Sequence, residues 1–88
     1  MKQNGLLVVD DHPVYREALK ERLGADFSPL GVTVFGAASA DEGLDILDRE
    51  DLHWTILLDI QMPGLSGLAV IKAFKSQPRV AHVVAISG

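Results

Sequence analysis

Four short apolar runs alternate with three segments of helical periodicity in this chain, and this alternation constrains its fold more than any other feature. The runs are rich in Val, Ile, Leu and aromatic residues and end at turn residues, a pattern typical of β-strands. We expect strands at Leu6–Asp10, Val32–Ala37, Trp54–Asp59 and Ala81–Ser87. The first and third runs show no polar alternation, which indicates strands covered by helices on both faces.

The first helical segment opens at Pro13, a residue type favoured at the first position of a helix. We expect a helix over Pro13–Leu23, with Gly24 as a left-handed stop and Ala25–Gly31 as a plain connection. The apolar stripe of this helix consists of Val14, Ala18, Leu19 and Leu23.

Two further helices are predicted from capping and helix-breaking residues. Ser39 and Glu42 form a capping box that predicts a helix over Ala40–Arg49. Ser66 can cap a third helix, which must end before Pro78. The residues expected to face the core are Ala40, Gly43, Leu44 and Leu47 in the second helix, and Val70, Ile71 and Phe74 in the third.

Strands that alternate with helices of this length indicate right-handed crossovers and a doubly wound parallel α/β sheet. The chain has 88 residues, 48% of them hydrophobic, which is enough for one compact domain and too little for two. We therefore expect one domain over residues 1–88.

Composition excludes several classes of protein. The absence of cysteine excludes disulfides and thiolate metal sites and suits a reducing cytoplasm. Twelve acidic and eight basic residues give a net charge of −4 without a basic cluster, so direct binding to nucleic acid is not expected. The apolar runs are too short to cross a bilayer, and the polar start Met1–Asn4 is not a signal peptide, so we expect a soluble, cytoplasmic protein.

Acidic residues stand where the predicted strands end. Asp10 and Asp11 follow the first run, Asp59 closes the third, and Ser87 closes the fourth. Ligands of open parallel sheets bind at the carboxyl ends of the strands. If the first and third strands are neighbours, the three carboxylates converge and repel one another unless a cation neutralises them. Oxygen ligands with no Cys or nearby His favour Mg²⁺.

The simpler interpretation of a single such aspartate is a helix-terminal or turn role. Three of them at strand ends, two of them adjacent, favour a metal site instead. His12 is interpreted as a residue at the start of a helix or in solvent, and Trp54 as a packing residue.

The loop after Asp59 adds a more specific pattern. Met62-Pro63 and Gly67 follow that aspartate, the acidic pair closes the first predicted strand, and Ser87 closes the fourth. In this order the chain resembles the receiver domain of bacterial two-component response regulators. The resemblance covers essentially all 88 residues, and Asp11-His12-Pro13-Val14-Tyr15-Arg16 is similar to the subfamily with a helix-turn-helix DNA-binding output domain.

The resemblance implies a phosphoacceptor signalling domain with a flavodoxin-like fold. Asp59 would accept a phosphoryl group from a sensor histidine kinase. Asp11, Asp59 and the backbone carbonyl of Gln61 would hold Mg²⁺, with Asp10 acting through water. Ser87 would contact the phosphoryl group and carry the switch signal.

The chain departs from the family pattern at its carboxyl-terminal end. The family order of strands is 2-1-3-4-5, whereas four predicted strands give 2-1-3-4 here. The resemblance places the last strand, two helices, the phosphate-binding lysine and the aromatic switch residue beyond residue 88. None of the lysines of this chain (Lys2, Lys20, Lys72, Lys75) closes a predicted strand.

Two alternatives to a phosphorylated receiver remain open. An enzyme that forms an aspartyl-phosphate would need a second acid/base Asp two residues after Asp59, where this chain has Gln61, so we do not expect an enzyme. A non-phosphorylated receiver could instead serve as a structural or dimerisation module. With no fifth strand, the unblocked edge at Val83–Ile86 predicts self-association through the fourth-strand region.

Overall fold

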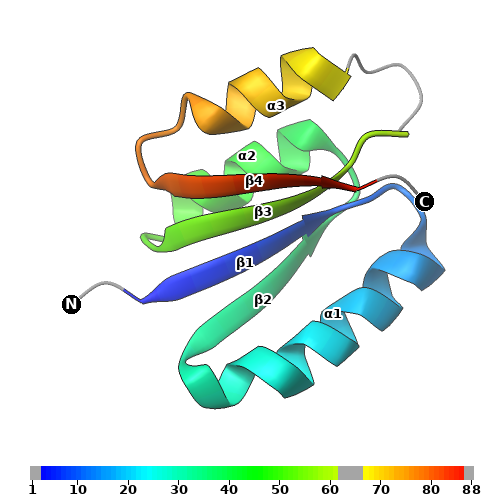
Figure 1. Ribbon diagram of the computed structural model, residues 1–88, viewed down its shortest axis with the longest axis vertical. Helices are drawn as coiled ribbons and strands as arrows, with labels where there is room; N and C mark the ends of the chain where they lie inside the picture. The colour runs from blue at the N-terminus through cyan, green and yellow to red at the C-terminus, as the bar shows by residue number, and fades with distance from the viewer. Residues whose placement is uncertain (1–2, 62–66, 87–88) are drawn as a thin grey trace.

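The computed structural model describes residues 3–61 and 67–86. Its centre is one sheet of four parallel strands (Figure 1). These are β1 (Asn4–Val9), β2 (Val32–Ala37), β3 (His53–Asp59) and β4 (Val80–Ile86). The order across the sheet is β2-β1-β3-β4, which confirms the predicted flavodoxin-like order 2-1-3-4.

The helices cover both faces of the sheet. Helix α1 (Pro13–Phe27) lies on one face, and α2 (Ala40–Arg49) and α3 (Gly67–Lys75) lie on the other (Figure 1). Strand β1 is buried from Gly5 to Val9, as expected for a central strand covered on both faces. In β3, Thr55 and Leu57 are only half-buried, so the expectation of two covered faces holds for β1 and was wrong for β3.

The main core lies between the sheet and the pair α2 and α3. Val70 and Phe74 of α3 are buried as predicted, and Ile71 packs against the cluster they belong to. Gly43 of α2 permits a close approach, because a Cβ there would lie 3.1 Å from the Phe74 ring. The Ser39 hydroxyl accepts a hydrogen bond of 3.1 Å from the amide of Glu42, which confirms the cap of α2.

Helix α1 differs from its prediction at its end. It continues through Gly24 to Phe27 and is followed by a short 3₁₀ helix, η1 (Ser28–Leu30). The left-handed residue is Gly31, with φ of 79°, so the prediction of Gly24 as the stop was wrong. The cost of one glycine within a helix is about 1 kcal/mol. Phe27, which the longer helix includes, lines an apolar pocket together with Leu6 and Val32.

The apolar stripe predicted for α1 is only partly covered, because Leu19 and Leu23 are half-buried whereas Val14 and Ala18 are exposed. The helix has no buried residue, and Val14 is 84% exposed. Arg16 and Lys20 approach β2 instead, where a Cβ on Gly36 would lie 2.5 Å from Lys20 Cδ and 3.4 Å from Arg16 Cδ. Long charged side chains cover apolar surface with their methylene stems while their charges stay near solvent, and apolar periodicity does not register this kind of contact.

Several ends lie one or two residues from their predicted positions. Strand β1 begins at Asn4 and ends before Asp10, and β4 begins at Val80. Ser66 and Ser87 lie outside the described residues. No helix among residues 3–61 and 67–86 combines the length and apolar character needed to span a membrane.

Candidate functional site

The pairing of β1 with β3 brings their acidic ends together. Val9 of β1 lies opposite Leu58 of β3, so Asp10 and Asp59 are the next pair at the carboxyl edge of the sheet. The amide of Asp10 donates a 3.0 Å hydrogen bond to the carbonyl of Ala37, which keeps Asp10 aligned with β2 beyond the end of β1. The sequence prediction that the two strands are neighbours is therefore confirmed.

The two carboxylates at this edge are buried and oriented by their own backbones. Asp10 is 1% exposed and Asp59 is 5% exposed. Asp10 Oδ1 accepts a 2.9 Å hydrogen bond from the amide of His12, and Asp59 Oδ1 accepts one of 2.9 Å from the amide of Gln61. Each aspartate thus bonds the amide two residues ahead, which fixes its carboxylate at the start of a loop.

Asp11 supplies an oxygen that lacks a hydrogen-bond donor. Its Oδ1 atom is shielded from solvent and accepts no hydrogen bond from any described residue. A shielded carboxylate oxygen is costly unless a donor or a cation satisfies it. Together with the buried oxygens of Asp10 and Asp59, this orphaned atom makes a donor set that fits a hard divalent cation such as Mg²⁺.

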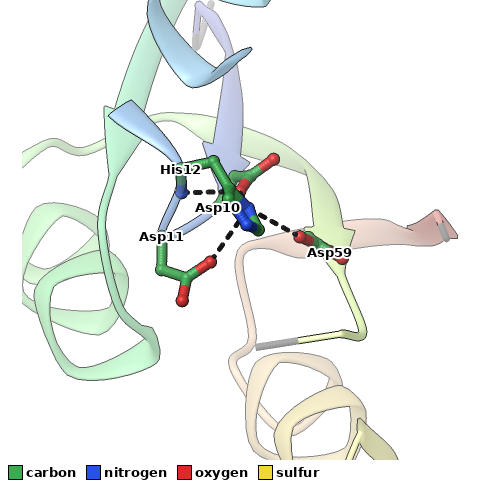
Figure 2. A group of neighbouring side chains, drawn as sticks. All are labelled: Asp10, Asp11, His12 and Asp59. Atoms are coloured by element: carbon green, nitrogen blue, oxygen red, sulfur yellow. Dashed lines mark hydrogen bonds and ion pairs between the residues drawn. The ribbon is translucent and has the colours of Figure 1, made fainter. Parts of the chain in front are cut away.

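His12 lies at the start of α1 and is mostly exposed, as predicted, but it also belongs to this cluster, so the expectation of a ligand set with no nearby His was wrong. Figure 2 shows its ring between the carboxylates of Asp11 and Asp59. Its Nδ1 atom lies 2.9 Å from Asp10 Oδ1, 3.1 Å from Asp11 Oδ1 and 3.8 Å from Asp59 Oδ2. One potential ligand atom from each of the four residues lies within 4.8 Å of all the others.

The charge of the cluster acts on the imidazole. The hydrogen bond to Asp10 and the negative charge of Asp11 raise the pKa of His12 above its ordinary value of 6.5. The sequence contained one usable signal for this placement, because His12 stands between the acidic pair and Pro13 and cannot move far from either.

The structure gives less information on the other predicted site residues. Gln61 follows Asp59 closely and is exposed, and the metal-binding role of its carbonyl stays a prediction. Ser87 and the Met62-Pro63 pair lie outside the described residues. Among the lysines in the described part of the chain, Lys20 lies on α1, and Lys72 and Lys75 lie in the last turn of α3.

Arg16 is the basic side chain that the described residues place against the backbone of the site. Its Nη1 atom donates a 2.9 Å hydrogen bond to the carbonyl of Asp10, so the guanidinium ties α1 to the end of β1. No prediction from the sequence singled out this contact.

Comparisons with known proteins agree with this fold. Response regulator GacA of Pseudomonas aeruginosa is 40% identical over 80 residues, which cover 90% of this chain and 36% of GacA. A response regulator receiver protein from Pseudomonas putida has a crystal structure with 30% identity and a TM-score of 0.78, covering 100% of this chain and 70% of that one. Response regulator protein TrrA from Thermotoga maritima, solved in complex with Mg(2+)-BeF, has 28% identity and a TM-score of 0.69 over 99% of this chain and 88% of its own.

The chain thus spans little more than a third of the length of GacA. Residues 6–88 match the family described as the response regulator receiver domain, and this range includes the whole sheet from Leu6 onward and all four residues of the acidic cluster. The chain therefore belongs to the response regulator receiver domain family.

Proposed function

We propose that the chain is the phosphoacceptor domain of a two-component response regulator and that Asp59 receives the phosphoryl group from a sensor histidine kinase. The observation that carries this proposal is the position of Asp59, a buried carboxylate at the end of a central strand beside Asp10 and Asp11. The match over residues 6–88 and the likeness to a receiver solved with Mg(2+)-BeF support it.

The phosphoryl transfer requires little covalent chemistry from the protein. A carboxylate oxygen of Asp59 forms a bond to phosphorus while the P–N bond of the phosphohistidine breaks, and the departing imidazole nitrogen keeps the electron pair and takes a proton. Positioning supplies most of the rate in such reactions. The hydrogen bond from the Gln61 amide to Asp59 Oδ1 holds the carboxylate in one orientation before the donor arrives.

The proposed metal residues are Asp11, Asp59 and the carbonyl of Gln61, with Asp10 acting through water. Bound Mg²⁺ would neutralise charge that develops on the phosphoryl oxygens. The orphaned Oδ1 atom of Asp11 supports this assignment, since a cation would supply its missing partner. Ser87 is proposed to hydrogen-bond a phosphoryl oxygen and to carry the switch signal.

The same site argues for a signalling domain that is not a classical enzyme. We infer that phosphorylation acts as a signal and that any DNA-binding output, of the helix-turn-helix kind, lies on another part of the whole protein. Relatives of this chain include a transcriptional activator, ExaE of Pseudomonas putida. A cytoplasmic location agrees with such a role and belongs to the same proposal.

A second candidate is a receiver that is not phosphorylated and acts as a structural or dimerisation module. The lysines of the described residues lie on α1 and α3, so none closes a described strand to meet the phosphoryl group. Without a lysine to neutralise the phosphoryl oxygens, phosphorylation of Asp59 would be weak or short-lived.

Intact-mass measurement after incubation with acetyl phosphate and Mg²⁺ separates the two candidates. We expect a minor species heavier by one phosphoryl group in the 88-residue chain. This species should disappear in Asp59→Asn and persist in Asp48→Asn, a matched change on the exposed side of α2. A wild-type chain that never acquires the mass under any donor favours the structural module, and labelling that survives in Asp59→Asn contradicts the assignment of the acceptor.

A further inference from the structure

The His12 imidazole is held among the carboxylates by its backbone. The residue precedes Pro13, and its φ of −90° and ψ of 103° are the extended conformation that a following proline favours. Its amide donates to Asp10 Oδ1 at 2.9 Å. These two constraints fix the Cα atom, and the ring nitrogen Nδ1 then points into the acidic cluster although most of the side chain is exposed (Figure 2).

The spacing of Nδ1 from its neighbours is that of ligands around one ion. Adjacent donors of an octahedral ion with bonds of about 2.1 Å lie about 3.0 Å apart, and opposite donors lie about 4.2 Å apart. For the two carboxylates proposed as direct ligands, Nδ1 is 3.1 Å from Asp11 Oδ1 and 3.8 Å from Asp59 Oδ2. Its 2.9 Å contact with Asp10 Oδ1, which is proposed to act through water, is a hydrogen bond. Because these atoms lie within 4.8 Å of one another, small side-chain movements would close Nδ1, Asp11 and Asp59 on a cation.

The hydrogen bond between the His12 ring and Asp10 does not provide a donor for the Asp11 oxygen. Nδ1 carries at most one proton and shares it with Asp10 Oδ1, while Asp11 Oδ1 stays without a donor among the described residues. A metal ion at the same place would satisfy the imidazole nitrogen and the Asp11 oxygen together. The neutral ring would then carry its proton on Nε2.

We propose that His12 Nδ1 is a direct ligand of the metal ion at this site, and that the site binds later first-row divalent ions such as Co²⁺ more tightly, relative to Mg²⁺, than an all-oxygen site would. Imidazole suits borderline transition ions, whereas Mg²⁺ prefers oxygen. This inference rests on the metal site of the proposed function and adds one ligand and a metal preference to it.

Pulsed electron paramagnetic resonance of bound Mn²⁺ tests the ligand directly, because a coordinated imidazole gives a nitrogen coupling. The chain has three histidines, so the double variant His53→Asn, His82→Asn retains His12 as the sole imidazole. We expect the nitrogen coupling in wild type and in this double variant, and its loss in His12→Phe. The Phe ring keeps the bulk of the side chain and removes the donor.

Calorimetry tests the metal preference. His12→Phe should lower the affinity for Co²⁺ roughly tenfold or more, a loss of the size seen when groups around bound metals are removed. Its affinity for Mg²⁺ should change much less. His53→Phe, a matched change at the amino end of β3 far along the strand from Asp59, should leave both affinities as in wild type.

The outcomes separate this inference from the function on which it rests. Mn²⁺ that binds in wild type, fails to bind in Asp11→Ala and shows no nitrogen coupling would overturn the role of His12 and leave the proposed metal site standing. Equal losses of Co²⁺ and Mg²⁺ affinity in His12→Phe would overturn the metal preference. Failure of the wild-type chain to bind either Mn²⁺ or Mg²⁺ would overturn both proposals.

Discussion

Gly5 of β1 lies opposite Trp54 of β3, and the indole ring occupies the space that a side chain on Gly5 would need. A Cβ at position 5 would lie 2.7 Å from Trp54 Cζ3 and 2.8 Å from Cε3. The ring is 1% exposed and makes an edge-on contact with Phe35 at 5.2 Å between centroids. It therefore has little room to move away.

We expect Gly5→Ala to destabilise the fold by about 1–3 kcal/mol, the usual cost of overfilling a packed core. Urea denaturation followed by Trp54 fluorescence measures this change. Gly24→Ala is the matched control, because a Cβ at Gly24 meets nothing within 4 Å. That substitution lies within α1 and should stabilise the protein by about 0.5–1 kcal/mol. If the two substitutions changed the free energy of unfolding equally, the contact with Trp54 would not limit the size of the side chain at position 5.

Mg²⁺ binding should depend on Asp11. We expect Asp11→Ala to abolish the calorimetric signal of Mg²⁺ binding, because it removes the shielded carboxylate oxygen that accepts no hydrogen bond from the described residues. Asp45→Ala, on an exposed position of α2, should bind Mg²⁺ as wild type does. An unchanged affinity in Asp11→Ala would remove Asp11 from the proposed ligand set.

Metal-free protein should show a pH effect that originates at His12. Its pKa lies above 6.5 in the folded state because of the hydrogen bond to Asp10 and the charge of Asp11. The interaction therefore stabilises the fold fully below pH 6.5, and this contribution is lost as the pH rises through the folded-state pKa. With EDTA present, the urea midpoint of wild type should exceed that of His12→Phe by more at about pH 6 than at about pH 9.

Nuclear magnetic resonance of the His12 ring checks the cause of this effect. The pKa of His12 should fall in Asp10→Asn, which removes the charge of its hydrogen-bond partner. A His12 pKa at or below 6.5 in the metal-free wild-type protein would contradict the electrostatic account.

Self-association of the 88-residue chain is expected through β4. This strand lies at one edge of the sheet, and its pairing within the described residues is with β3. Val84 is 46% exposed, and neither proline nor a charged residue interrupts Val83–Ile86. Such an edge offers unpaired backbone groups to another copy. Sedimentation at low micromolar concentration should show a dimer or a larger assembly.

A lysine at this edge should weaken the assembly. We expect Val84→Lys to sediment as a monomer and to retain its far-ultraviolet circular dichroism. Val14→Lys, the same change at an exposed position of α1, should leave the assembly intact. A wild-type chain that sediments as a monomer and melts independently of its concentration would exclude association through β4.

Local patterns in the sequence determined much of the fold. Strand β2 has its predicted bounds, the Ser39 cap begins α2, and α3 ends before Pro78 with Val70 and Phe74 buried. These features depend on neighbours within about one helical turn or on alternation within one run, so a single segment contains the information. The resemblance to receivers also implied the strand order and the acidic residues at the strand ends.

Tertiary structure alone decided which side chains share the site and which face of α1 meets the sheet. The imidazole of His12 lies among three carboxylates because β3 pairs with β1, a contact between residues more than forty positions apart in the chain. The stems of Arg16 and Lys20, instead of Val14 and Ala18, approach β2 because Gly36 leaves room for them. Periodicity records the spacing of residues along one element, whereas these contacts are decided by the shape and charge of the surface that the element meets.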